Sequence, residues 1–223
     1  MDTSPVVVDV ETAPLPNAAD YFEPVEPDAR LVDPVKIAAS IAAKTEAQQS
    51  KAGLDWNVGR IAALAWWTED DGVIVRLCPE EPDEALALTE FWRVSRHRPI
   101  LGFNIKSFDL RFLVQRSRLL GVAHPILDLG RFSKGSIIDL YSELTFNDSQ
   151  DTWCMRRTLH AFCRRFGIPV TDTAQGKDMP ALIAVGDWAA VEAHVASDVL
   201  LTVELARKLR MIASVPKIYE VKA

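Results

Sequence analysis

Two carboxylates, Asp9 and Glu11, stand two residues apart near the start of the chain. They follow a short β-branched run that begins at Pro5 and predicts a buried strand. Residues i and i+2 of a strand point to the same face, so both carboxylates project together. Because burying two like charges is costly without a compensating cation, the pair favours a metal site. The alternative is an exposed strand end at which both residues merely begin a loop.

A third carboxylate, Asp198, lies within a strongly periodic segment near the end of the chain. Side chains that can pack recur at positions 188, 191, 195, 199, 202, 205 and 209, the three- and four-residue steps of a packed helix. Asp198 lies on or beside this stripe, and His194 lies one turn before it on nearly the same side. The two residues belong either to a site or to a surface pair at the edge of the stripe.

The fourth carboxylate, Asp109, belongs to the segment LGFNIKSFDLRFL, residues 101–113. A short strand in this segment is followed by a polar loop, and such strand ends are where α/β sheets place their sites. We expect Ser107 to cap the following helix and Asp109 to occupy its first turn. A carboxylate in a first helical turn also interacts favourably with the helix dipole, so stability alone is an alternative role.

The elements that must position these residues follow from hydrophobic periodicity and turn residues. We predict strands over 5–10, 59–67, 73–78, 99–103 and 136–140, and helices over 34–53, 82–97, 109–121, 155–166 and 187–211. Pro14 and Pro16 should prevent the first strand from continuing. This order of elements indicates an α/β domain with a mixed sheet, in which an antiparallel meander precedes strands parallel to the first.

The composition limits the class of protein. With 223 residues, 48% of them apolar and 25% charged, the chain is typical of one globular domain. Its longest apolar stretch is too short to span a bilayer, and no basic segment typical of a signal peptide precedes the first apolar run. We therefore expect a cytoplasmic protein with no membrane partner. A net charge of −6 argues against a broad nucleic-acid-binding surface, but not against an enzyme that contacts a few nucleotides.

Three sequence blocks together resemble the DEDD superfamily of 3′→5′ exonucleases. They are VVVDVET with its Asp-x-Glu pair, LGFNIKSFDLRFL with its Phe-Asp, and HVASDVLLT around Asp198. The chain is most similar to the branch related to the proofreading domain of family-B DNA polymerases. The resemblance covers nearly the whole chain and implies an RNase H-like fold. It also implies a single exonuclease domain over 1–223, with an insertion at about 14–57 between the first two strands.

The resemblance further implies a catalytic site that holds two divalent cations, Mg²⁺ or Mn²⁺, on four carboxylates: Asp9, Glu11, Asp109 and Asp198. Hard cations of this kind prefer oxygen ligands. One cation would acidify the attacking water and the other would stabilise the leaving 3′ oxygen. The substrate would be the 3′ end of single-stranded DNA, with RNA as an alternative, contacted by Thr12, Asn104 and Phe108. Lys106 is a looser candidate for a phosphate contact, and its alternative is a solvated charge.

The sequence departs from the family at the general base. The family carries Tyr four residues before the last Asp or His five residues before it, whereas here His194 is four before Asp198 and Ala193 is five before. An imidazole suits proton abstraction near neutral pH, so we expect His194 to act as the base. Alternatively, Glu192 or the metal ion does this work and His194 only orients water. A catalytically weak binding module on the same fold is a second reading of the same departure.

A basic run, Arg156-Arg157 with Arg164-Arg165, flanks one predicted helix. It could follow the backbone of a nucleic-acid strand. The alternative is the solvated face of an amphipathic helix.

Overall fold

The computed structural model describes residues 4–130, 135–146, 158–172 and 174–212. Its centre is a five-stranded mixed sheet in the order β3-β2-β1-β4-β5. The strands are β1 (Val6–Pro14), β2 (Gly59–Thr68), β3 (Gly72–Leu77), β4 (Ile100–Gly102) and β5 (Ile137–Asp139). The pairs β1–β2 and β2–β3 are antiparallel, whereas β4 is parallel to both β1 and β5. The predicted meander followed by parallel strands is therefore confirmed.

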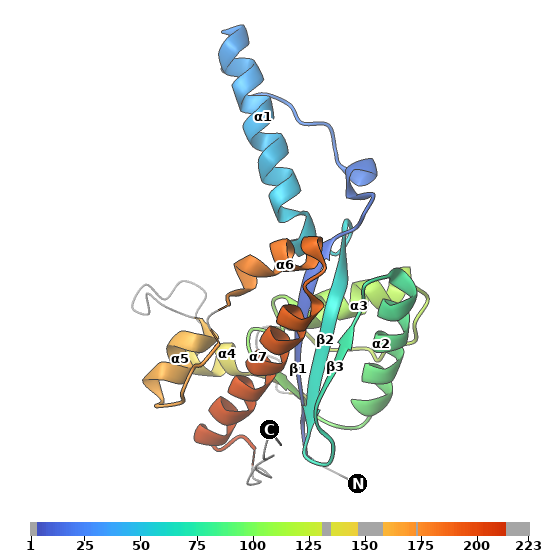
Figure 1. Cartoon of the computed structure of the whole chain (residues 1–223), viewed down its shortest axis with the longest axis vertical. Coiled ribbons are helices and arrows are strands. Elements are labelled where there is room, and N and C mark those ends of the chain that lie inside the picture. Colours follow the sequence, from blue (N-terminus) through green and yellow to red (C-terminus); the bar gives the residue numbers. More distant parts are fainter. Residues whose placement is uncertain (1–3, 131–134, 147–157, 173, 213–223) are drawn as a thin grey trace.

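Helices cover both faces of the sheet (Figure 1). The helices are α1 (Pro34–Lys51), α2 (Glu81–Val94), α3 (Asp109–Leu119), α4 (Leu140–Leu144), α5 (Leu159–Arg165), α6 (Met179–Val185) and α7 (Trp188–Lys208). One face packs against α5, α6 and α7, and the other against α2 and α3. Alternate residues of β1 supply the two cores, since Val7 faces α7 and Val8 faces α2 and α3.

The first strand runs further than predicted, through Pro14. The strand does end at a proline, since Pro14 is its last residue and pairs only with Gly59 of β2, but it runs four residues past the predicted end at Val10. A missing N–H is tolerated at such a position. The register shifts between Glu11 and Thr12, where Ala62 of β2 has no partner in β1, which marks a bulge in β2 beside the two carboxylates.

The helix termini follow their capping residues. Asp33 caps α1 and Asp187 caps α7, each by accepting a hydrogen bond from a backbone N–H in the first turn. The helix α3 starts at Asp109 as predicted, but the prediction that Ser107 caps it is wrong, because the N-cap residue is Phe108, which makes no side-chain cap. Of the helix predicted over 155–166, the part from Leu159 is present, and residues 155–157 lie outside the described residues.

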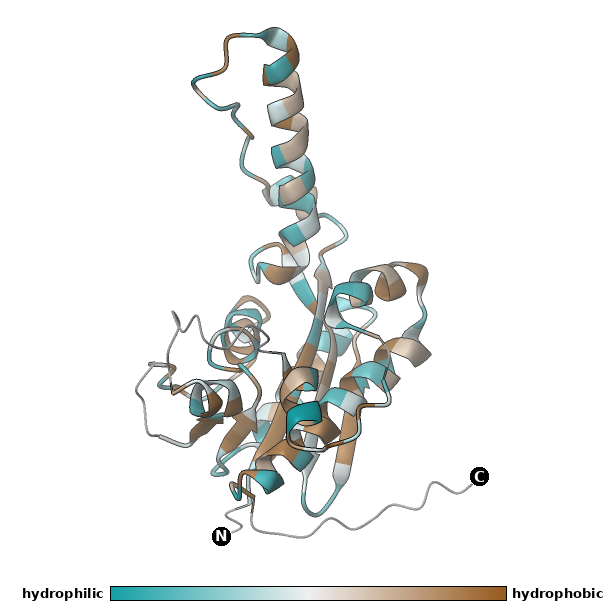
Figure 2. Cartoon of the chain, turned by 90° about the vertical axis from the view of Figure 1, so that its left-hand side faces the viewer, coloured by the Kyte–Doolittle hydropathy of each residue, from teal (hydrophilic) through white to brown (hydrophobic). Residues whose placement is uncertain are grey.

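The segment between β1 and β2 forms an arm that projects away from the sheet (Figure 1). Helix α1 buries none of its residues, and Figure 2 shows hydrophilic and hydrophobic residues mixed along its length. The extended stretch before it lies alongside, and Lys44 donates a hydrogen bond to the carbonyl of Glu26. At its base, the arm continues into a short 3₁₀ helix, Ala52–Leu54, against β1.

Within the described part of the chain, no helix combines the length and apolar character needed to cross a membrane.

Candidate functional site

The first two predicted site residues, Asp9 and Glu11, lie on the α7 face of β1 and are partly buried. Their neighbours across the β1–β2 ladder are Ala65 and Ala63. Opposed residues of an antiparallel pair share a face, so these small side chains leave space above the sheet next to the carboxylates. The strand continues beyond both residues, which excludes the alternative that they begin a loop.

A cavity of about 380 Å³ opens at this point. It brings together residues far apart in the sequence, from β1, the loop before α3, α7 and the arm. The predicted site residues among its lining are Asp9, Glu11, Thr12, Asn104, Phe108, Asp109, His194 and Asp198. Lys106 and Glu192 do not line it, and Glu192 is exposed to solvent. The geometry therefore gives no support to Glu192 as an alternative base.

Asp139, the last residue of β5, holds the loop that delivers Asp109 to the cavity. One of its carboxylate oxygens accepts the backbone N–H of Asn104 at 2.9 Å, and the other accepts that of Lys106 at 3.0 Å. Asn104 adopts a left-handed backbone with φ of 63°, a conformation that asparagine tolerates better than most residues. The same carboxylate caps α4 through the N–H of Tyr141. Asp139 thus ties β5 to the loop before α3.

Burial and mutual repulsion raise the pKa values of Asp9, Glu11 and Asp109. Burial raises the pKa of Glu11 to about 8, and the charges of Asp198 and Asp109 add to this rise. Burial also raises the pKa of Asp109 to about 7, although N–H groups of its own backbone and of Val10 oppose the change. The pKa of Asp9 is raised well above its ordinary value by burial and then by Asp109 and Glu11. Bound cations would therefore stabilise the cluster strongly, because they would offset the repulsion between its carboxylates.

His194 lies beside this cluster and is only 2% exposed, so it is not the surface residue of the alternative interpretation. Its Nδ1 lies 2.5 Å from Oδ2 of Asp172. Its Nε2 lies 3.4 Å from Oε1 of Glu11 and 3.9 Å from Oδ2 of Asp198. That nitrogen is buried and makes no hydrogen bond. One ring nitrogen is thus occupied, and the other is directed at the carboxylates.

Two further site residues were not predicted from the sequence, Asp172 and His160. Nε2 of His160 lies 3.1 Å from Oδ1 of Asp198, so this carboxylate has a histidine near each oxygen. Asp172, His194 and Asp198 each offer one atom that could bind a metal ion, a carboxylate oxygen or a ring nitrogen. These three atoms lie within 4.8 Å of one another, close enough to share one ion. Asp172 lies in an irregular segment and His160 in a predicted helix far from α7 in the sequence, and only the tertiary fold brings both residues to α7.

The base of the arm forms one wall of the same cavity. Gln49 and Ser50 from the last turn of α1 line it together with Gly53 and Leu54. Gly53 packs closely on β1, since a Cβ at this position would lie 3.2 Å from the ring of Pro14. The insertion is thereby attached to the site by its base, while the rest of α1 stays exposed to solvent.

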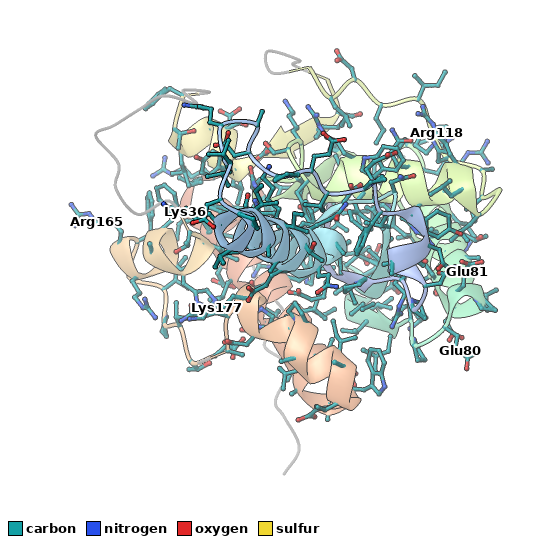
Figure 3. The ribbon with its side chains drawn as sticks, turned by 90° about the horizontal axis from the view of Figure 1, so that it is seen from above. Lys36, Glu80, Glu81, Arg118, Arg165 and Lys177 are labelled. Carbon is teal, nitrogen blue, oxygen red and sulfur yellow. The ribbon has the colours of Figure 1, made fainter. Side chains whose placement is uncertain are left out.

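The predicted basic run is described only in part, because Arg156 and Arg157 lie outside the described residues. Arg164 and Arg165 are exposed near the end of α5. Seen from above, Arg165 points outward at the side of the molecule opposite to Glu81 (Figure 3). Neither arginine lines the cavity, which favours the solvated-face interpretation for this pair.

No known protein family matches the sequence, and no curated protein matches it. Among solved structures, the chain is similar to the family B DNA polymerase from the hyperthermophilic archaeon Pyrobaculum calidifontis, with a TM-score of 0.61 and 17% sequence identity. The match covers 94% of this chain but 25% of the polymerase chain, so the chain spans about a quarter of that protein's length. At this identity the likeness concerns the fold. Together with the mixed sheet and its flanking helices, it confirms the predicted α/β, RNase H-like fold.

Proposed function

We propose that the chain is a metal-dependent 3′→5′ exonuclease of the DEDD type, folded as one domain over residues 1–223 with an insertion at about 14–57. The observation that carries the proposal is the convergence of four acidic side chains from three separate segments on one cavity: Asp9, Glu11, Asp109 and Asp198. Carboxylates whose pKa values rise together are costly to assemble unless the site binds cations.

The donor set fits Mg²⁺ or Mn²⁺. The four carboxylates supply hard oxygen ligands, and no cysteine is among the described residues that line the cavity. When bound, two such cations would neutralise the cluster and stabilise the charge that develops on a phosphodiester during hydrolysis. The carboxylates of β1 and α7 would hold the cations, and Asp109 would approach them from the start of α3.

The other residues of the cavity have separate tasks in this proposal. His194 would accept a proton from the attacking water at Nε2, the ring nitrogen that faces the carboxylates. Phe108 and Asn104 would hold the terminal nucleotide, Phe108 by packing on a base or sugar. Thr12 would contact the 3′ end through its backbone. Lys106 stays outside the cavity lining and would at most steer the substrate.

The proposed substrate is the 3′ end of single-stranded DNA. The fold shared with a family B DNA polymerase supports this choice, because that protein acts on DNA. RNA remains the second candidate, since no residue of the cavity has been shown to reject a 2′-hydroxyl. The base of the arm, with Gln49 and Leu54, would form the wall against which the last nucleotides lie.

The test uses single-stranded DNA and RNA labelled at either end, incubated with Mg²⁺, Mn²⁺ or a chelator. We expect stepwise shortening from the 3′ end that requires a metal ion and is lost in Asp9→Ala. Glu69→Gln is the matched control, because Glu69 is an exposed acidic residue in the β2–β3 turn, outside the cavity lining. If folded protein cleaves neither substrate with either metal, the proposal fails. Tight metal-dependent binding without cleavage would instead support the weak binding module.

A further inference from the structure

We propose that Asp172 positions His194 by fixing its tautomer, so that the Nε2 lone pair faces the carboxylate cluster. This inference rests on the proposed function and names a residue that the sequence blocks do not contain. Asp172 lies in the segment that joins α5 to α6, and it reaches α7 only in the folded protein.

The geometry identifies the ring nitrogen of His194 that donates to Asp172. Asp172 is an acceptor, so the ring nitrogen 2.5 Å from its Oδ2, Nδ1, must carry the proton and donate it. A neutral imidazole then has its lone pair on Nε2, which is buried, has no hydrogen-bond partner and lies 3.4 Å from Glu11. A carboxylate behind a histidine sets the tautomer in this way in both acid–base and metal sites.

Asp172 is itself held in place. Its Oδ1 accepts the backbone N–H of Ala174 at 2.9 Å, which leaves Oδ2 for His194. Burial alone would raise its pKa, but the hydrogen bonds from His194 and Ala174, together with the electrostatic influence of His194 and His160, outweigh burial and keep the pKa below its ordinary value. The group therefore stays ionised, as an acceptor for Nδ1–H must be. An unpaired buried imidazole would have no such constraint on its orientation.

A competing role for Asp172 is that of a metal ligand, together with His194 and Asp198. The short contact to Nδ1 disfavours it, because the Asp172 oxygen and the imidazole nitrogen occupy each other instead of a shared cation. Metal affinity separates the two roles. A positioning residue can be neutralised with little change in Mn²⁺ affinity, whereas loss of a ligand weakens binding directly.

The first experiment reads the tautomer itself. Long-range ¹H–¹⁵N spectra of the Mg²⁺-loaded protein, with His194 assigned by comparison with His194→Gln, should show a protonated Nδ1 and an unprotonated Nε2. In Asp172→Asn the amide can donate to Nδ1, so the proton should move to Nε2. Asp172→Glu should keep the original tautomer. An unchanged tautomer in Asp172→Asn overturns the inference, whether or not the protein is a nuclease.

The second experiment measures cleavage and metal binding in the same variants. We expect Asp172→Asn to lower kcat by about 10²–10³-fold with little change in KM, since only proton transfer is impaired. Asp172→Glu should recover part of that loss. In a His194→Ala background, Asp172→Asn should change the rate by no more than about twofold, because the two residues act through one another.

Each outcome bears on one proposal. A wild-type protein that cleaves DNA, with Asp172→Asn as fast as wild type, refutes the role of Asp172 and leaves the exonuclease proposal intact. A wild type that does not cleave, but whose tautomer responds to Asp172→Asn, refutes the exonuclease proposal alone. A loss of Mn²⁺ affinity of about tenfold or more in Asp172→Asn, with Glu69→Gln unchanged, assigns Asp172 to the metal and overturns the positioning role.

Discussion

Neutralising a carboxylate of the cluster should stabilise the metal-free protein, although it removes a proposed ligand. Asp109→Asn is the most informative change, because Asp109 is only 5% exposed and asparagine has nearly the same shape. The rise of its pKa from 3.8 to about 7 corresponds to about 4 kcal/mol of lost stability when the group is ionised in both the folded and unfolded states.

The direction of the pH dependence follows from the raised pKa. Below the unfolded-state pKa of about 4, the carboxyl is protonated in both states and costs nothing. As the pH rises from this value to the folded-state pKa of about 7, the unfolded state is already ionised while the folded state still holds its proton. The free energy of unfolding therefore falls over this range and is lowest above pH 7. Asp109 should therefore lower the free energy of unfolding of the wild-type protein by about 2 kcal/mol at pH 5 and by about 4 kcal/mol at pH 8.

Asp109→Asn is neutral and does not lose this stability, but it keeps only part of the hydrogen bonding that the carboxylate receives from the backbone. Allowing about 1 kcal/mol for the weaker bonds leaves a net gain of about 3 kcal/mol at pH 8 and about 1 kcal/mol at pH 5. For a chain of this length that corresponds to about 6–12 °C in Tm at pH 8.

The assay is thermal unfolding of wild type, Asp109→Asn and the control Glu69→Gln, in chelator and then with Mn²⁺. Mn²⁺ should raise the Tm of the wild type and of the control, and should raise that of Asp109→Asn much less. If Asp109→Asn in chelator is no more stable than wild type at pH 8, or if its advantage is the same at pH 5, the repulsive cluster inferred from the structure is wrong.

Three further predictions concern the scaffold. Gly102→Ala should lower stability by about 1–3 kcal/mol in denaturant unfolding, because a Cβ there would lie 2.2 Å from the nearest side-chain atom. Glu84→Ala should cost about 3–5 kcal/mol, since it leaves the buried Arg116 without its bidentate partner at 2.8 Å, and a loss below about 1 kcal/mol would contradict this. Cys78 and Cys163, whose pKa values burial raises to about 12, should resist iodoacetamide at neutral pH until the protein unfolds, as peptide mass mapping can show.

The sequence was most informative where chemistry and local periodicity coincide. The two-residue spacing in β1 placed Asp9 and Glu11 on one face, and the stripe of α7 placed Asp198 on or beside its packed side, with His194 one turn before it. Both inferences need only the geometry of one element. The length of β1 was underestimated. A proline can stand in a strand where its missing N–H faces no neighbouring strand, and Pro14 has a neighbour only in β2. Which side of a strand has a neighbour is a property of the sheet, so it could not be predicted from the sequence.

Long-range partners were beyond this kind of reasoning. Asp172 is 22 residues from His194, and His160 is 38 residues from Asp198, with no periodic relation between them. An aspartate in an irregular segment has the same local appearance whether it caps a turn or supports a catalytic histidine. The two roles can be told apart only when the path of the chain between α5 and α7 is known.

The charge of the cavity bears on the order of events at the site. The described residues that line it include four carboxylates but neither lysine nor arginine. A phosphodiester brought into this cavity without cations would meet only repulsion from ionised groups, and the imidazole of His194 already faces Asp172 and Glu11. Under the proposed function, cations would therefore enter before or together with the nucleic acid. The acidic net charge of the chain is consistent with this dependence, because attraction for the substrate would come from the bound metal ions rather than from the protein surface.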